Sequence, residues 1–340
     1  PQAIRDCTFI EDPQLRLRCF DEAVGQASFD APEAQQLHSE QTPVIDQAQG
    51  SKIRLWPWQE PPLEKGHSWF DQRWELTNSD KRGPFQIRPY KPVYLLPLFY
   101  SARRNERPQS PNPLNTVSSN QQLGATEAKF QVSFKTKLLQ RPFGQSADLW
   151  FGYTQSSRWQ VYNHKTSRPF RETNYEPEFM LTWPAQWAAF EQSTGWKVRM
   201  VGLSLNHQSN GRSQPFSRSW NRVIALLGLE KDNTLLQVRP WARLPESEQE
   251  NDNPDINDYI GRMDALLVHK HQGHELSLMM RHNLRFSDRS RGAVRLGWAF
   301  PIESNLRGYF EWFSGYGESL IDYNHRSTYL GAGISLVGWY

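Results

Sequence analysis

A short run of the chain, VGLSLNHQS at residues 201–209, alternates between two sets of side chains. One set is apolar and then polar: Val201, Leu203, Leu205, His207, Ser209. The other set is small or polar: Gly202, Ser204, Asn206, Gln208. Successive side chains of a β-strand point to opposite faces, so the pattern predicts a strand with one largely apolar face. In a soluble protein that face would pack in a core, and in a membrane barrel it would be the outer wall.

The same run contains the elements of a nucleophilic site. His207 and Ser209 lie on one face with Cβ atoms roughly 6.5–7 Å apart, a gap that an imidazole and a hydroxyl can bridge. If the chain turns at residues 211–217 and returns antiparallel, Asn221 can lie beside His207 and accept its second ring N–H. Nucleophile, base and orienting group form the arrangement of a serine hydrolase. The spacing of His207 and Ser209 alone does not establish catalysis, and the hypothesis depends on the turn and on Asn221.

The composition limits the class of protein. Across 340 residues, 39 Lys and Arg are interspersed with 36 Asp and Glu, so no basic stripe indicates a nucleic-acid partner. No apolar run approaches the roughly 20 residues that a spanning helix needs. Hydrophobic residues are only 37%, yet aromatic residues reach 13%, with 14 Trp. This combination is typical of strands with one polar face inside a barrel and aromatic girdles outside.

Alternating runs continue from about Phe85 to Tyr340 and number about twelve, each near the 9–11 residues that a tilted membrane strand requires. We therefore predict an all-β fold, a twelve-stranded antiparallel transmembrane β-barrel with a small N-terminal extension. Residues 84–100 contain several prolines and are predicted to form one long edge strand. Closure of the last strand against the first would remove both sheet edges. The alternative is a soluble β-sandwich.

Residues 1–82 are predicted to be a periplasmic extension, partly helical or disordered, and residues 83–340 the barrel. Cys7 and Cys19 are the only cysteines, and their spacing suggests one local disulfide in an oxidising compartment; two buried thiols are the alternative. A small helix is expected at about residues 13–25 and a flexible linker to about residue 51. The polar start of the sequence reads as a processed end with no signal peptide.

Four separated motifs then carry a resemblance. They are RETNYEP at residues 171–177, NHQSNGRS at 206–213, SRSWNR at 217–222 and SGYGESLIDY at 314–323. Together they closely resemble the outer membrane phospholipase A family of Gram-negative bacteria, from about Gly83 to the C-terminus. The resemblance implies an outer-membrane barrel that hydrolyses acyl esters of glycerophospholipids, with A1, A2 and lysophospholipase activity. It also implies calcium dependence and activation by formation of a homodimer.

The resemblance assigns catalytic roles by position. Ser209 would be the nucleophile, His207 the general base and later acid, and Asn221 the group that orients the imidazole. The main-chain N–H of Gly211 would contribute to the oxyanion hole. A neutral amide suits a lipid-facing wall, because a carboxylate there would be costly to bury.

The resemblance also implies ligands for Ca²⁺ and a dimer seam. The Arg212 carbonyl and the Ser217 hydroxyl would bind the metal, and the main-chain carbonyl of Ser167 would come from the dimer mate. Hard oxygen ligands suit Ca²⁺. Arg168, beside Ser167, is bulkier and more charged than expected next to such a ligand. Gln155 continues an outward register and matches a family glutamine at the seam.

Other interpretations remain open. A catalytically inactive barrel acting as a pore or binding protein would share the same fold. Four histidines near each other in sequence are expected to mark wet strand ends rather than a metal site: His269, His271, His274, His282. The charges at Arg171 and Glu172, and at Arg262 and Asp264, are expected to form ion pairs within the lumen.

Overall fold

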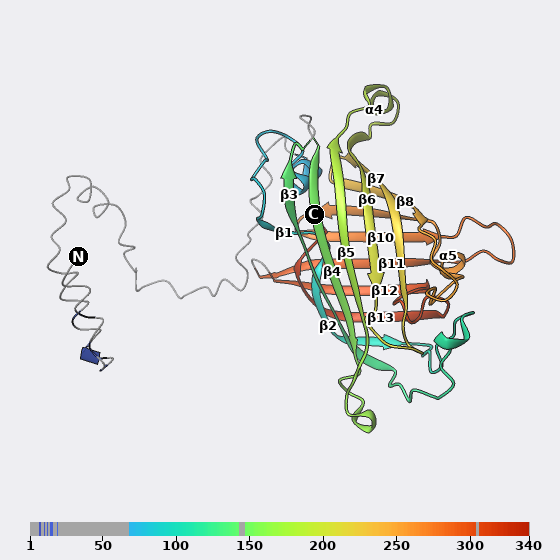
Figure 1. Cartoon of the computed structure of the whole chain (residues 1–340). Helices are drawn as coiled ribbons and strands as arrows, with labels where there is room; N and C mark the ends of the chain where they lie inside the picture. The colour runs from blue at the N-terminus through green and yellow to red at the C-terminus, as the bar shows by residue number, and fades with distance from the viewer. Residues whose placement is uncertain are drawn as a thin grey trace. The chain divides into compact units, whose positions relative to one another are not determined.

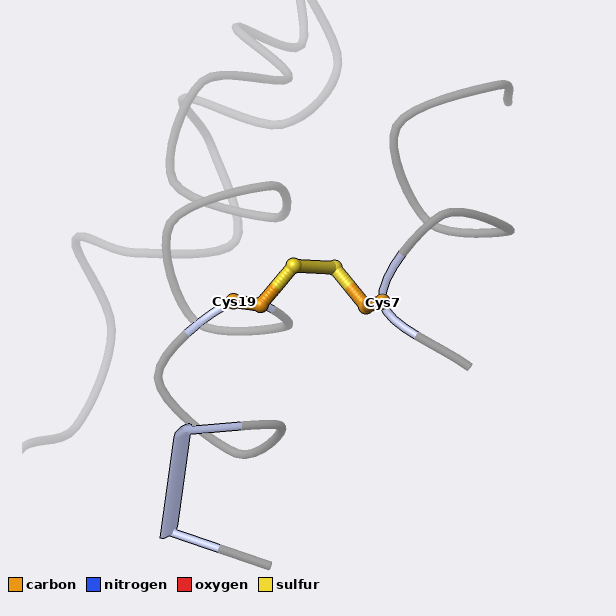
Figure 2. The surroundings of a disulfide bond; sticks show 2 residues. All are labelled: Cys7 and Cys19. Carbon is orange, nitrogen blue, oxygen red and sulfur yellow. A yellow bond between two sulfur atoms is a disulfide. The ribbon is translucent and has the colours of Figure 1, made fainter. Parts of the chain in front are cut away.

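The computed structural model describes Cys7, Ile10, Asp12, Gln14, Leu15 and Cys19 and then residues 68–142, 147–303 and 306–339. The chain divides into two compact units, Pro1–Leu55 and Trp56–Tyr340. In the first unit a disulfide joins Cys7 to Cys19, as their spacing suggests (Figure 2). Most of the predicted helix and linker of residues 13–51 lies outside the described residues. The periplasmic placement of the extension remains a prediction.

The second unit is a closed antiparallel barrel of twelve strands with one additional short strand, within the described residues. The additional strand is β1 (Ile87–Pro89). The barrel strands are β2 (Val93–Ser101), β3 (Thr126–Gln140), β4 (Asp148–Trp159), β5 (Phe170–Pro184), β6 (Lys197–Ser209), β7 (Ser219–Lys231), β8 (Thr234–Arg243), β9 (Met263–His271), β10 (His274–His282), β11 (Gly292–Glu303), β12 (Leu306–Tyr316) and β13 (Arg326–Val337). In Figure 1 strands β3 to β8 cross strands β10 to β13 of the opposite wall, as the tilt of barrel strands requires.

Pairing of β13 with β2 closes the sheet. Tyr329 is opposite Ser101 and Val337 is opposite Val93, while β2 pairs with β3 along its other side. The predicted twelve-stranded barrel is therefore confirmed, and the sandwich alternative is excluded. None of the helices in the described ranges has the length and apolar character needed to cross a bilayer.

The connections differ between the two ends of the barrel. At one end the loops are long, at residues 102–125, 160–169, 210–218, 244–262, 283–291 and 317–325. They contain the short helices η2 (Pro113–Asn115), η3 (His164–Thr166) and α5 (Ile256–Tyr259). The other end has two-residue turns at residues 232–233 and 272–273, and α4 (Ala188–Thr194) lies between β5 and β6. Outer-membrane barrels have long loops outside the cell and short turns in the periplasm.

The two faces of the wall follow the predicted register. Outward positions are apolar and exposed, including Leu95, Leu98, Val132, Phe179, Val201, Leu203, Leu205, Leu276, Leu296, Trp298, Phe310 and Leu330. Inward positions on the same strands are polar and buried, as Lys129, Ser133 and Lys135 are on β3. A contiguous apolar exterior of this extent is suited to hydrocarbon rather than water.

Ion pairs fill the lumen. The Lys129 ammonium lies 2.5 Å from a Glu311 oxygen and 2.8 Å from a Glu318 oxygen, and Arg158 contacts Glu318 at 2.8 Å. These side chains are almost fully buried. A polar cavity of about 140 Å³ lies among them. In this cluster each charge has a partner of opposite sign, which reduces the cost of removing it from water.

Helix α3 (Trp69–Trp74) enters the lumen at the short-turn end. The main-chain N–H of Trp69 donates to Glu230 Oε1 at 3.0 Å, and Asp71 pairs with Arg199. The Trp74 ring packs edge-on against Trp150, with 6.0 Å between ring centroids. A short helix within the predicted extension is therefore part of the packed interior of the barrel.

The prediction of one long edge strand over residues 84–100 is wrong in two respects. The segment forms two strands, β1 and β2, interrupted at residues 90–92. Strand β2 is also paired on both sides. Its proline, Pro97, is tolerated because the register with β3 shifts between Leu96 and Phe99, where a ladder donor is dispensable.

The lumenal charges pair with other strands or loops rather than along one strand. Arg171 binds Glu127 at 2.8 Å and Asp322 at 2.7 Å instead of Glu172. Asp264 binds Arg239 at 2.6 Å instead of Arg262. Burial would raise the pKa of the Asp322 carboxyl, but Arg171 and the hydroxyl of Ser319 hold that pKa below its usual value. Strand pairing thus selects partners that sequence proximity does not indicate.

Glu75 provides a test of this network. Its carboxylate is fully buried and contacts Arg88 and Lys137, the latter at 2.7 Å. Glu75→Gln leaves the buried Arg88 without this carboxylate and leaves Lys137 with Asp148 alone, 2.8 Å away, so we expect the free energy of unfolding to fall by about 3–5 kcal/mol. Urea denaturation in detergent micelles measures this value. Glu248→Gln, in an exposed loop position, is the matched control and is expected to stay within about 0.5 kcal/mol of wild type. An unchanged urea midpoint for Glu75→Gln would contradict the role of the ion pairs.

Candidate active site

Paired strands β6 and β7 bring His207 and Asn221 together on the outer wall. The two residues are direct cross-strand partners, and His207 Nδ1 lies 2.8 Å from Asn221 Oδ1. His207 is exposed and Asn221 is half-buried, on the face that also carries Val201, Leu203 and Leu205. The predicted contact between base and orienting group is therefore present, and it lies outside the lumen.

Ser209 ends β6 on the same face, two residues beyond His207. Its cross-strand neighbours are Ser219 on β7 and Tyr175 on β5. Within the described part of the chain its hydroxyl has no hydrogen-bond partner, so it is neither committed to another group nor bonded to the imidazole. A hydroxyl that is half-buried and unpaired beside an imidazole is available to a reacting molecule.

Gly211 shapes the turn that follows Ser209. Its φ is +61°, in the left-handed region, and a Cβ at this position would stand 3.0 Å from Tyr175 Cε2. Both facts favour glycine. Among the contacts of the described residues its main-chain N–H has no acceptor. A free N–H next to the serine is the geometry that an oxyanion hole requires.

The predicted calcium ligands of the β6–β7 loop lie near a carboxylate. Ser217 Oγ donates to Asp252 Oδ2 at 2.6 Å, and Ser219 Oγ lies 3.4 Å from the same oxygen. Asn115 Nδ2 donates to the other oxygen, Asp252 Oδ1, at 3.0 Å. The carbonyl of Arg212 accepts no hydrogen bond from the described residues. Carbonyl, hydroxyl and carboxylate oxygens form a donor set that fits Ca²⁺.

Histidine, cysteine and carboxylate side chains do not gather in threes at a metal-binding spacing anywhere in the described ranges. The four histidines of β9 and β10 have other neighbours: His269 contacts the hydroxyl of Thr234, and His274 stacks on Trp298.

Ser167 lies in a different hairpin from Arg212 and Ser217. It is exposed in the β4–β5 loop with a left-handed φ of +59°. Among the described residues no hydrogen bond joins it to either of them. Arg168 turns its guanidinium to His164 Nδ1, 2.6 Å away, and its carbonyl accepts from the Trp159 indole at 3.0 Å.

Gln155 lies on β4, on the outer wall between Val132 and Tyr175 of the neighbouring strands. Its Oε1 accepts from the Tyr153 hydroxyl at 3.2 Å. The amide nitrogen has no partner among the described residues.

Comparisons with known proteins identify the family. The family model described as Phospholipase A1 matches residues 70–336. The chain belongs to the phospholipase A1 family. It is 42% identical over 265 residues to a putative phospholipase A1 of Neisseria meningitidis, covering 77% of this chain and 68% of the relative. It is 37% identical over 254 residues to phospholipase A1 of Escherichia coli, covering 74% and 82%.

Solved structures extend the comparison. Outer membrane phospholipase A from Escherichia coli superposes with a TM-score of 0.67 at 35% identity, covering 75% of this chain and 100% of that one. A Salmonella typhi outer membrane phospholipase, described as a dimer with bound calcium, has a TM-score of 0.67 at 34% identity, covering 76% and 95%. The resemblance inferred from the four motifs is thus confirmed. This phospholipase A1 family member is a β-barrel of the bacterial outer membrane.

Sequence reasoning about this candidate site missed two carboxylates. Asp252 contacts the predicted ligand Ser217, and Glu246 accepts from Asn221 Nδ2 at 3.0 Å. Both come from the β8–β9 loop, whose polar sequence resembles any surface loop. In the sequence, only the run of acidic residues at 246–255 indicates that carboxylates could lie near the site.

Gly211→Ala tests the turn. A left-handed alanine costs about 1–2 kcal/mol, and its methyl group would push against Tyr175 and displace the N–H beside Ser209. We expect at least a tenfold fall in kcat for phospholipid hydrolysis, measured by fatty-acid release in mixed micelles. The matched control is Gly195→Ala, a left-handed glycine (φ +74°) after α4 at the opposite end of the barrel. An equal effect of both substitutions would argue against a local role for Gly211.

Proposed function

We propose that the protein hydrolyses the acyl ester bonds of glycerophospholipids, with A1, A2 and lysophospholipase activity, through Ser209, His207 and Asn221. The observation that supports this most is the 2.8 Å contact between His207 Nδ1 and Asn221 Oδ1 on the lipid-facing wall, with Ser209 beside it. A polar pair on an apolar exterior lowers the stability of a membrane protein, so its presence indicates a functional use. Membership of the phospholipase A1 family agrees with that use.

Each residue has a defined step. Ser209 Oγ attacks the ester carbonyl carbon while its proton passes to His207 Nε2. The imidazolium then gives this proton to the departing alcohol as the C–O bond breaks, which leaves an acyl group on Ser209. A water molecule, deprotonated by His207, releases the fatty acid and restores the serine. The Gly211 N–H stabilises the oxyanion formed in both steps.

Substrate would enter sideways from the bilayer. The site lies at the long-loop end of the wall, where the outer leaflet meets the extracellular loops. The exposed side chains of Val201, Leu203 and Leu205 continue down the same face toward the membrane centre. An acyl chain can therefore remain in hydrocarbon while its ester reaches Ser209.

We propose that Ca²⁺ assists this reaction. The Arg212 carbonyl, the Ser217 hydroxyl and the Asp252 carboxylate of this chain would hold the ion, with the Ser167 carbonyl contributed by a second copy. A bound calcium ion supplies Lewis-acid stabilisation of the oxyanion, directly or through its water. A related Salmonella typhi protein is described as a dimer with bound calcium, which supports a role for the metal and for a second copy.

Homodimerisation follows from the same arrangement. Ser167 is exposed in its own loop, so its carbonyl is open to a second copy. A metal shared in this way would link two copies, and calcium binding and dimerisation would favour each other. Gln155, with its oxygen engaged by Tyr153 and its nitrogen unpaired, would meet its two-fold mate across the seam.

The alternative function, an inactive barrel serving as a pore or binding protein, receives less support. The lumen contains paired charges and α3, and the polar cavity between them is about 140 Å³. Single-channel conductance together with absent esterase activity would favour this alternative.

Ser209→Ala tests the nucleophile. Without the hydroxyl no acyl-enzyme forms, so we expect fatty-acid release to fall by at least about 10³-fold. Ser193→Ala in α4, an exposed serine far from the site, is the control. Heat-modifiable gel mobility checks that both barrels fold. Full activity of a folded Ser209→Ala variant would refute the assignment.

Calcium chelation tests the metal and the dimer together. We expect a chelator to stop hydrolysis and to lower the fraction of chemically cross-linked dimer in detergent, with heat-modifiable mobility unchanged. Asp252→Asn removes a charged ligand, so about tenfold more calcium would be needed for half-maximal activity. Gln155→Ala would need a higher protein concentration to reach the same dimer fraction.

Magnesium replacement is the control for ionic strength, because Mg²⁺ dehydrates reluctantly and demands a tighter octahedral site. Turnover that persists in excess chelator would remove the metal from the mechanism. A dimer fraction that does not depend on calcium would show that calcium binding and dimerisation are not coupled.

A further inference from the structure

The carboxamide of Asn221 is held on both sides. Its Oδ1 faces His207 Nδ1 at 2.8 Å, and its Nδ2 donates to Glu246 Oε1 at 3.0 Å. A carboxylate accepts hydrogen bonds but donates none, so Glu246 determines which end of the amide is nitrogen. The amide oxygen must then face the ring, and Nδ1 must carry the proton. This tautomer leaves the lone pair of Nε2 for the hydroxyl of Ser209.

Glu246 is itself fixed by a cation. Its Oε2 accepts from Arg243 Nη2 at 2.6 Å, and both side chains are largely buried. Arg243 in turn donates to Asn251 Oδ1 at 2.6 Å and to the Asn253 carbonyl at 3.0 Å. The main-chain N–H of Leu244 donates to the Asn221 carbonyl at 2.8 Å. The start of the β8–β9 loop is thus anchored directly to the orienting residue.

We propose that Glu246 is a positioning residue of this hydrolase, the fourth group in the series Ser209, His207, Asn221 and Glu246. The inference rests on the proposed function. Glu246 sets the orientation of the amide and supplies, one group further out, the negative charge that asparagine lacks. A charged acceptor polarises the amide and strengthens the bond that its oxygen accepts from the imidazole.

The arrangement also keeps the negative charge away from the hydrocarbon of the membrane. A carboxylate at position 221 would face hydrocarbon on the outer wall, at a cost of several kcal/mol. At position 246 the carboxylate lies in the long-loop end, paired with Arg243. No proton moves to it during the reaction: Nδ1 keeps its proton, and Nε2 takes and returns the proton of Ser209.

The test compares E246Q with E248Q, which removes the same charge from an exposed position two residues later in the loop. Hydrolysis of phosphatidylcholine in mixed micelles with saturating calcium yields kcat and KM. E246Q is expected to lower kcat about tenfold or more, the loss of one charged hydrogen bond, with KM within twofold of wild type. E246D is expected to recover part of kcat, and E248Q to match wild type. E246A replaces E246Q if the latter lacks heat-modifiable mobility.

A double-mutant cycle separates positioning from a general structural role. If Glu246 acts through Asn221, then N221A/E246Q is no slower than N221A. A loss in E246Q that persists in full on the N221A background would overturn the proposal, as would wild-type kcat in E246Q. S209A separates failure of the proposed function from failure of the role of Glu246. If S209A is active, the proposed function is wrong. If S209A and N221A are inactive and E246Q is fully active, only the role of Glu246 is wrong.

Discussion

Hydrogen bonding between β13 and β2 turns an open sheet into a closed wall, and the two environments of this protein exist because of that closure. With no free edge, every strand satisfies its backbone groups within the wall, as a bilayer demands. One face of each strand then lies toward hydrocarbon, and the other faces a polar interior packed with side chains. Lys129, Glu311 and Glu318 can be buried only because closure brings their strands and loops around a common centre.

The same constraint explains why the candidate active site is built as it is. A polar site on the outer wall lacks the lumenal ion pairs, so it must satisfy its groups along the wall. His207 does so with a neutral amide on the adjacent strand, and the charge enters only beyond that amide, at Glu246, where Arg243 balances it. The long loops thus extend the site in two directions: one contains Ser217 and the other contains Glu246 and Asp252.

Much of this could be anticipated from side-chain periodicity. The alternation at residues 201–209 correctly predicted which side chains face out, because the period of a strand is two. The pairing of His207 with Asn221 followed from the length of the turn between them. Predictions failed where partners come from distant strands. Arg171 pairs with Glu127 and Asp322 rather than Glu172, and Pro97 lies inside the closed sheet rather than on its edge.

By itself the sequence determined the strand register, the number of barrel strands, the family and the three residues proposed for catalysis, since all of these depend on local alternation or on contiguous motifs. Only the tertiary structure decided what fills the lumen and what supports the amide. Helix α3 has too short a pattern to be located from sequence, yet its contacts with Glu230 and Arg199 place it inside. Glu246 lies 25 residues beyond Asn221 in an ordinary acidic loop, and its contact exists because β7 and β8 pair and bring that loop back over the site.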